Sequence, residues 1–456
     1  MSRTAKKKYE IDMCNGPILK KMLLFAIPLM FSSILQLLFN AADIVVVGRF
    51  AGDDSLAAVG STSSLINLLT NLFIGLSVGA NVLVARYFGA KKEDELKETV
   101  HTAMTLSLIG GIALTVIGIV GAPIILAWMQ SPPEVLDLAV VYLRVYFVGM
   151  TATMVYNFGS SILRAVGDTK RPLYFLSIAG VVNVTLNLIF VIVFHWGVFG
   201  VGLATVISQV ISAGLVLRCL MREQGGIRLD LKCLGINKGK LLQIMQIGIP
   251  AGFQGMLFSL SNVVIQSSVN SFGNIVVAGN SAASNIEGFV YVAMNAFYQA
   301  AISFTGQNVG AGKYSRVNKI MLAAEGCVIF FGLVLGNLAV LFGEPLVGIY
   351  SDSAAVITAG VLRLSIICAP YCLCGMMDVM VGVLRGLGYS IAPMIVSLLG
   401  ACAFRLVWIA TIFQVDQFHT IETVYFSYPI SWTLTFAAHL VTFVIVRKRL
   451  KKRWGE

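Results

Sequence analysis

Twelve long apolar windows constrain the fold of this chain more than any other feature. Each is long enough to cross a bilayer as a helix of about 20 residues. Only 12% of the 456 residues are charged and 57% are hydrophobic, whereas soluble domains carry about 25% charged residues. We therefore expect an all-α polytopic membrane protein with 12 transmembrane helices in two six-helix bundles. The windows cover approximately residues 20–48, 56–86, 99–128, 135–163, 172–195, 198–220, 241–270, 276–308, 318–343, 354–384, 391–414 and 423–446.

The two groups of six windows repeat one another at an offset of about 221 residues. Both halves contain the pattern R-x-x-G-x-x-x-x-P, which begins at Arg164 and again at Arg385. The stretch FGAKK at 88–92 matches VGAGK at 309–313, and Pro28 matches Pro250. Because six is an even number, both halves enter the membrane from the same side, which predicts parallel repeats. The predicted domains are an N-terminal lobe (1–220), a cytoplasmic linker (221–240) and a C-terminal lobe (241–456).

Charged residues between the windows alternate in sign along the chain. One set of loops is rich in Lys and Arg, and the other carries mainly acids, with Arg49 as the exception. This asymmetry predicts that both termini lie in the cytoplasm and that the protein resides in the plasma (inner) membrane. It also accounts for the net charge of +11, so we expect contact with the lipid bilayer and none with nucleic acid. A monomer is expected.

Two parallel bundles predict a cleft near the membrane midplane that opens to each side in turn, as in a secondary transporter. The sequence has no G-x-x-x-x-G-K-[ST] motif for ATP and no TVGYG filter of potassium channels. The eight cysteines lie mostly in apolar segments, and the four histidines are scattered. We therefore predict no catalytic residues, no enzyme activity and no cofactor besides a coupling ion.

Several motifs resemble the multidrug and toxic compound extrusion (MATE) family over the whole chain. They are NAADIVVVGR at 40–49, FGAKK at 88–92, QNVGAGK at 307–313 and the two R-x-x-G-x-x-x-x-P turns. The resemblance implies export of cationic, amphipathic compounds in exchange for H⁺ or Na⁺. Two alternatives remain: a lipid-linked precursor flippase, and a membrane-embedded enzyme or sensor. A flippase for an anionic headgroup should line its cleft with several basic residues, whereas only Arg405 is expected at depth.

Asp43 is a lone carboxylate in the first apolar window, and its counterpart in the second half is Ile265. A charge at that depth is costly, so it is paired, hydrated or used. The resemblance implies that Asp43 binds the coupling ion, either H⁺ or Na⁺ with neighbouring oxygens. The alternative is a carboxylate that caps a helix end near the outer interface.

Asn183 and Asn187 lie four residues apart and therefore on one helix face. Many relatives have an acid where this chain has Asn187, so the ion stoichiometry of the family does not transfer directly. The two amides are candidates to donate carbonyl oxygens to the cation beside Asp43. The alternative is that they form interhelical hydrogen bonds.

The second half places its charges differently, at Glu287, Asp378 and Arg405, whose counterparts are Ile66, Asn157 and Val184. We predict that Arg405 neutralises one of the two acids and that the other attracts cationic substrate or a second ion. The alternative is a purely structural ion-pair network. Four polar residues in other apolar windows are secondary candidates: Gln36, Asn40, Asn157 and Asn262.

Two further charged residues are assigned no chemistry. Arg363 is expected near an outer helix end, where its side chain extends to the interface. Glu325 is expected to reach the cytoplasmic interface, because it lies only about two turns into its helix.

Overall fold

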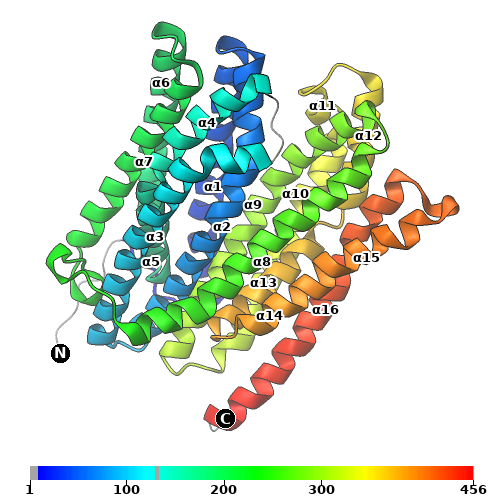
Figure 1. Cartoon of the computed structure of the whole chain (residues 1–456). Coiled ribbons are helices and arrows are strands. Elements are labelled where there is room, and N and C mark those ends of the chain that lie inside the picture. The colour runs from blue at the N-terminus through cyan, green and yellow to red at the C-terminus, as the bar shows by residue number, and fades with distance from the viewer. Residues whose placement is uncertain (1–8, 129–132, 455–456) are drawn as a thin grey trace. The chain divides into compact units, whose positions relative to one another are not determined.

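The computed structural model describes residues 9–128 and 133–454, and every regular element in these ranges is helical (Figure 1). The first half contains α1 (Ile18–Phe50), α2 (Asp53–Gly89), α3 (Glu93–Trp128), α4 (Pro133–Val148), α5 (Met150–Ala165), α6 (Lys170–Leu188), the π-helix η1 (Ile189–Val193) and α7 (Gly197–Met221). Two short 3₁₀ helices follow in the linker, η2 (Gly225–Ile227) and η3 (Leu231–Cys233).

The second half has the same order of long helices. It contains α8 (Lys238–Asn270), α9 (Asn274–Gly310), α10 (Arg316–Leu341), α11 (Gly343–Gly348), α12 (Ala354–Ile367), α13 (Cys372–Gly386), α14 (Ile391–Ser397), the π-helix η4 (Leu398–Ala403), α15 (Phe404–Ala410), η5 (Ile412–Gln414), η6 (Asp416–Phe418) and α16 (Ile421–Trp454).

The internal repeat is visible in the backbone. Helices α2 and α9 both have 37 residues, and each follows a glycine in the left-handed region, Gly52 at φ 89° and Gly273 at φ 91°. Helices α1 and α8 both have 33 residues. Gly167 and Gly388, in the two R-x-x-G-x-x-x-x-P turns, share φ 94°, a value that favours glycine. The predicted repeat is therefore confirmed.

Membrane-crossing segments account for most of the described chain. Nine helices are long and apolar enough to cross a membrane, and the count rises to eleven if each of two bent pairs is one span. The pairs are α4 with α5, bent by 45°, and α12 with α13, bent by 47°. The 37-residue helix α9 is not among these eleven. The prediction of an all-α polytopic membrane protein is confirmed.

Contacts between residues divide the chain into two compact units. The first unit comprises residues 1–12 and 31–252, and the second comprises 13–30 and 253–456. Each unit therefore takes the first part of one long helix from the other half of the chain, α8 in the first unit and α1 in the second. The predicted domain boundaries at residues 220 and 241 stay a prediction.

In the first unit, the start of α8 packs closely on α2. A Cβ on Gly75 or Gly79 would overlap the backbone of α8, and a Cβ on Gly248 would lie 2.6 Å from Leu76 Cα. Two G-x-x-x-G patterns face each other here, as is common between membrane helices. In the second unit, the start of α1 uses bulkier side chains, and Phe25 contacts Phe304 edge to face at 5.8 Å.

The linker is bound to the first unit. The backbone N–H of Asp230 donates to His101 Nε2 on α3 at 3.1 Å, and Glu95 forms an ion pair with Lys240. The backbone N–H of Lys232 donates to the Asp230 carboxylate and holds the pKa of Asp230 below its usual value. The linker is therefore an ordered part of the first unit.

Candidate cation and substrate sites

Asp43 and the two asparagines meet in the first unit. Asp43 lies in the last third of α1, and its half-buried carboxylate accepts a hydrogen bond from Asn187 Nδ2 on α6. The same amide group donates to Asn183 Oδ1 at 3.3 Å, one turn earlier on α6. Both asparagines are buried, with exposed fractions of 3% and 0%. Three residues that the sequence singled out separately therefore form one connected cluster.

The cluster continues onto α7 through a residue that the sequence analysis missed. Asn183 Nδ2 donates to Thr205 Oγ1 at 3.5 Å, and the Thr205 hydroxyl donates to the carbonyl of Val201. Thr205 could have been identified from the sequence, because Thr205, Ser208 and Ser212 recur at helical spacing and form a polar stripe on an otherwise apolar helix. We call Asp43, Asn183, Asn187 and Thr205 the Asp43 cluster.

One acceptor in the Asp43 cluster has no partner. Asn187 Oδ1 is buried and accepts no hydrogen bond from any described residue. Asp43 forms no salt bridge with a basic side chain in residues 9–128 and 133–454. A buried amide oxygen without a donor is unfavourable, and so is a carboxylate without a cation. Carboxylate, amide and hydroxyl oxygens are also the ligands that hard cations prefer.

The four secondary candidates lie outside this cluster. Gln36 and Asn40 share a face of α1 with Asp43, but their side chains are exposed. Asn262 on α8 is also exposed, and Asn157 on α5 is half-buried. None of the four hydrogen-bonds to a member of the Asp43 cluster within the described ranges.

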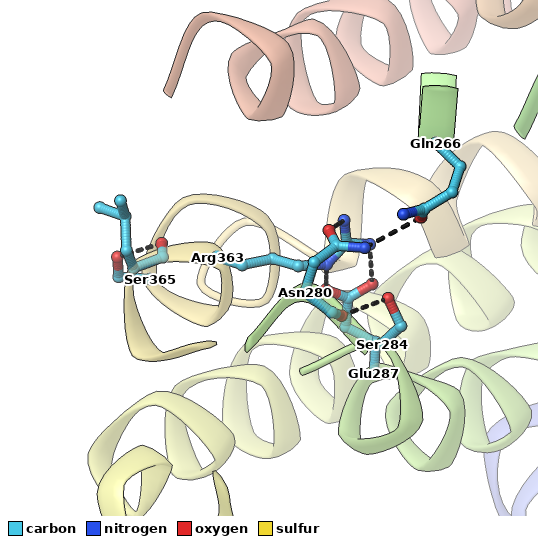
Figure 2. A network of polar contacts seen from close by, with 7 residues as sticks. Gln266, Asn280, Ser284, Glu287, Arg363 and Ser365 are labelled. Atoms are coloured by element: carbon cyan, nitrogen blue, oxygen red, sulfur yellow. Dashed lines mark hydrogen bonds and ion pairs between the residues drawn. The ribbon is translucent and has the colours of Figure 1, made fainter. Parts of the chain in front are cut away.

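The second unit contains a larger polar network around Glu287 (Figure 2). Arg363 on α12 donates to both oxygens of Glu287 on α9, with its Nε at 2.7 Å and a terminal nitrogen at 2.9 Å. The other terminal nitrogen donates to Asn280 Oδ1 at 2.6 Å, and Asn280 Nδ2 donates to Gln266 Oε1 on α8 at 3.0 Å. We call Gln266, Asn280, Glu287 and Arg363 the Glu287 network. Charge-assisted bonds of Arg363 join α12 to α9, and the neutral amide bond between Asn280 and Gln266 extends the network to α8.

Two predictions about arginines are wrong. Glu287 is neutralised by Arg363 and not by Arg405, and Arg363 is only 6% exposed, so it does not extend to the interface. The guanidinium of Arg405 lies over the Tyr428 ring at 4.3 Å from its centroid, and its Nε donates to Ser431 at 2.8 Å. Arg405 instead satisfies its buried charge through an aromatic face and a hydroxyl.

Asp378 remains separate from the Glu287 network. It lies half-buried on α13, and its electrostatic neighbours are Arg385 on α13 and Tyr291, four residues after Glu287 on α9. Among the described residues it has no salt bridge at hydrogen-bonding distance. The structure thus separates the three charges grouped by the sequence: a paired acid, an unpaired acid and an arginine stacked on an aromatic ring.

The expectation for Glu325 is also wrong. Its side chain is 7% exposed, and both carboxylate oxygens are buried. The distance of Glu325 from the start of its helix does not predict its exposure, because packing by the neighbouring helices determines which side chains reach water.

Comparison with known proteins gives one consistent result. The family model MatE matches residues 28–189 and 250–410. The chain is 27% identical over 386 residues to the probable multidrug resistance protein YoeA of Bacillus subtilis (strain 168), covering 83% of each chain. It is 24% identical over 442 residues to the multidrug export protein MepA of Staphylococcus aureus (strain NCTC 8325 / PS 47), covering 96% of each.

A solved structure of similar shape is that of a MOP superfamily transporter from Pyrococcus furiosus. It aligns with a TM-score of 0.91 at 23% identity and covers 98% of this chain and all of its own. At that identity the likeness concerns the fold alone, and it agrees with the two-lobe arrangement of twelve helices expected from the sequence.

Proposed function

Because the chain belongs to the MatE family, whose members are membrane transporters and not enzymes, we propose that it is a secondary antiporter. It exports small organic compounds, cationic and amphipathic ones in particular, in exchange for H⁺ or Na⁺ by alternating access. Its relatives YoeA and MepA are named for multidrug resistance and export, which supports this substrate class. The proposal includes cytoplasmic termini, as the distribution of basic residues indicates.

The observation that carries the proposal is the Asp43 cluster. It combines a carboxylate that lacks a basic partner in the described chain with a buried amide oxygen that lacks a donor. One cation meets both needs. A proton binds to the carboxylate oxygen of Asp43, or Na⁺ is held by Asp43 with oxygens of Asn183, Asn187 and Thr205.

The number of acids bears on stoichiometry. With Asn187 in place of a second acid, the Asp43 cluster carries one negative charge, and we propose that it binds one monovalent cation per cycle. In the second unit Arg363 already neutralises Glu287. Asp378 is therefore our candidate for attracting cationic substrate or a second ion.

The test is ion-driven efflux from proteoliposomes. The protein is reconstituted, a Na⁺ gradient or a pH gradient is imposed separately, and the efflux of a fluorescent organic cation is followed. Asp43→Asn should abolish efflux driven by the coupling gradient, since it removes the only carboxylate of the Asp43 cluster and with it the charge that binds the cation. The other gradient should drive little transport in either protein.

Thr185→Val provides a matched control on α6. Thr185 is exposed, and its hydroxyl donates only to the carbonyl of Val181 within its own helix. This variant should transport like the wild type. If Asp43→Asn transports normally under both gradients, coupling through the Asp43 cluster is refuted.

A further inference from the structure

Glu325 is a buried acid that the proposed coupling site does not use. It lies on α10, nine residues after Arg316 and so about 14 Å along the helix axis. Its side chain is 7% exposed, and both Oε1 and Oε2 are buried. No described residue forms a hydrogen bond or salt bridge with either oxygen.

The surroundings of Glu325 come from α9 and α13, against which α10 packs. Val328 lies about one turn after Glu325 on α10, and it packs closely on Gly375 of α13. A Cβ added to Gly375 would lie 2.5 Å from Val328 Cγ1 and 2.7 Å from Met294 Sδ on α9. On α10 itself, Ala324 and Val328 beside Glu325 are both 0% exposed. The acid therefore occupies the apolar face that joins three helices.

No charge on the packed helices compensates Glu325. None of their titratable side chains bonds to it within the described ranges. These side chains are Glu287, Tyr291 and Tyr298 on α9, Glu344 on α11, Arg363 on α12, Cys372, Cys374, Asp378 and Arg385 on α13, Arg447 on α16, which donates to Asn318, and Arg316, Lys319 and Cys327 on α10 itself.

The repeat shows what this position needs for packing alone. At the offset of 221, Glu325 corresponds to Met104 on α3, which is 2% exposed. The same offset also matches a pair of close helix contacts. In the first unit a Cβ added to Gly111 would lie 2.5 Å from Thr151 Cα, and in the second a Cβ added to Gly332 would lie 2.6 Å from Cys372 Cα. The first unit thus fills the equivalent space with a neutral, unbranched side chain. A carboxyl group is not required to fill it.

We propose that Glu325 is a proton-binding site of the second unit. Its carboxylate takes up one proton and is held as the neutral acid while it is buried between α9 and α13. It releases that proton when water reaches it. The reason is that an ionised carboxylate without partners is strongly disfavoured in such a place. This site is distinct from the Asp43 cluster and does not depend on which ion couples there.

The first test is the pH dependence of thermal unfolding in detergent, which requires no transport. A proton bound by the folded protein and lost on unfolding makes stability fall as pH rises, by up to tenfold in the unfolding equilibrium per pH unit. Above about pH 5 the wild type should therefore lose stability, relative to Glu325→Gln and Glu325→Met, as the pH rises. Glu325→Met introduces the residue that the first unit has at the equivalent position, Met104. Identical pH profiles for the wild type and both variants would overturn the proposal.

The second test is infrared spectroscopy of the purified protein near neutral pH. The wild type should show a protonated carboxylic acid carbonyl band, and its intensity should fall by the contribution of one carboxyl group in Glu325→Gln. Glu344→Gln is the matched control, because Glu344 is exposed at the start of α11, and it should keep the band. If neither Glu325 variant folds, the band is sought in wild-type protein with ¹³C-labelled glutamate. A purely carboxylate signal from the labelled residues would refute proton binding.

Discussion

The two units fill equivalent interior positions with opposite chemistry. In the second unit Asn280, Glu287 and Arg363 form the core of a charged network. At the offset of 221, the first unit has Val59, Ile66 and Tyr142, all of which are buried in one apolar cluster. The helices that carry them match in order and nearly in length. The duplicated backbone therefore accepts either solution, provided that volume is filled and buried charge is paired.

At Asp43, the candidate for binding the coupling ion, the first unit is the polar one and the second unit is apolar. Asp43 belongs to a polar cluster in the first unit, whereas its counterpart Ile265 in the second is 1% exposed and apolar. Each unit thus has a polar interior site where the other is apolar. The two copies have therefore diverged at these positions: the first unit carries the Asp43 cluster, and the second carries the ion-paired Glu287 network.

The largest predicted effect comes from breaking the Glu287 network. Glu287→Ile alone leaves Arg363 buried without a carboxylate, and Arg363→Tyr alone leaves Glu287 without a cation. Each should lower the free energy of unfolding by about 3–5 kcal/mol, since an uncompensated buried charge is strongly destabilising. Thermal unfolding in detergent would measure the loss.

The double variant Glu287→Ile/Arg363→Tyr sharpens the comparison. It installs the residue pair of the first unit and should recover most of the lost stability, because well-packed apolar residues often replace a buried ion pair without loss. Adding Asn280→Val should recover more. If the double variant is as unstable as the singles, the two interiors are not interchangeable.

The fold could be predicted from the sequence because the repeated residues that indicate it determine the backbone conformation. Glycines, prolines and the charges between windows specify turns, bends and crossings, and these recur at a fixed offset. Asn183 and Asn187 were placed on one face from spacing alone, and Asp43 was recognised from its depth.

Side-chain partners were harder to predict because they depend on how helices rotate and bend. Arg363 lies on α12, just before a 47° bend, and its depth could not be read from its distance to the window's end. Thr205 was missed because its partner Asn183 is on another helix. Glu325 was misplaced because burial depends on α9 and α13, which no local pattern on α10 reports.

Substitutions at the bends of the two units should change the stability of the protein by an intermediate amount. The bend of 45° between α4 and α5 occurs at Gly149, and the bend of 47° between α12 and α13 contains Pro370, 221 residues later. A Cβ on Gly149 would overlap Gln209 Oε1 and lie 3.1 Å from Val206 Cγ2. Gly149→Ala should therefore destabilise the protein by about 1–3 kcal/mol.

Pro370→Ala is the matched change in the second unit. It removes a ring that restricts the unfolded chain and should lower stability by about 1 kcal/mol or less. Unfolding temperatures of the two variants under the same conditions test this order. A larger loss for Pro370→Ala would mean that the proline, and not close packing, maintains these bends.

The smallest effect concerns one backbone angle after α2 and α9. Lys91 and Gly312 occupy the same position of a turn, with φ 56° and φ 69°, and their N–H groups donate to Phe88 and Val309 at 3.1 and 3.2 Å. A lysine is strained in this left-handed region, whereas a glycine is not. Lys91→Gly should therefore stabilise the protein by up to about 1 kcal/mol, after the greater flexibility of glycine in the unfolded chain is subtracted.

Gly312→Ala isolates the same angle, because a Cβ on Gly312 would meet no atom within 4 Å. It should destabilise the protein by about 1 kcal/mol through backbone strain alone. Opposite shifts of the unfolding temperature for Lys91→Gly and Gly312→Ala would confirm that the two turns are equivalent and differ only in the residue that each repeat has kept. Shifts of the same sign would show that the lysine side chain contributes contacts that offset the strain.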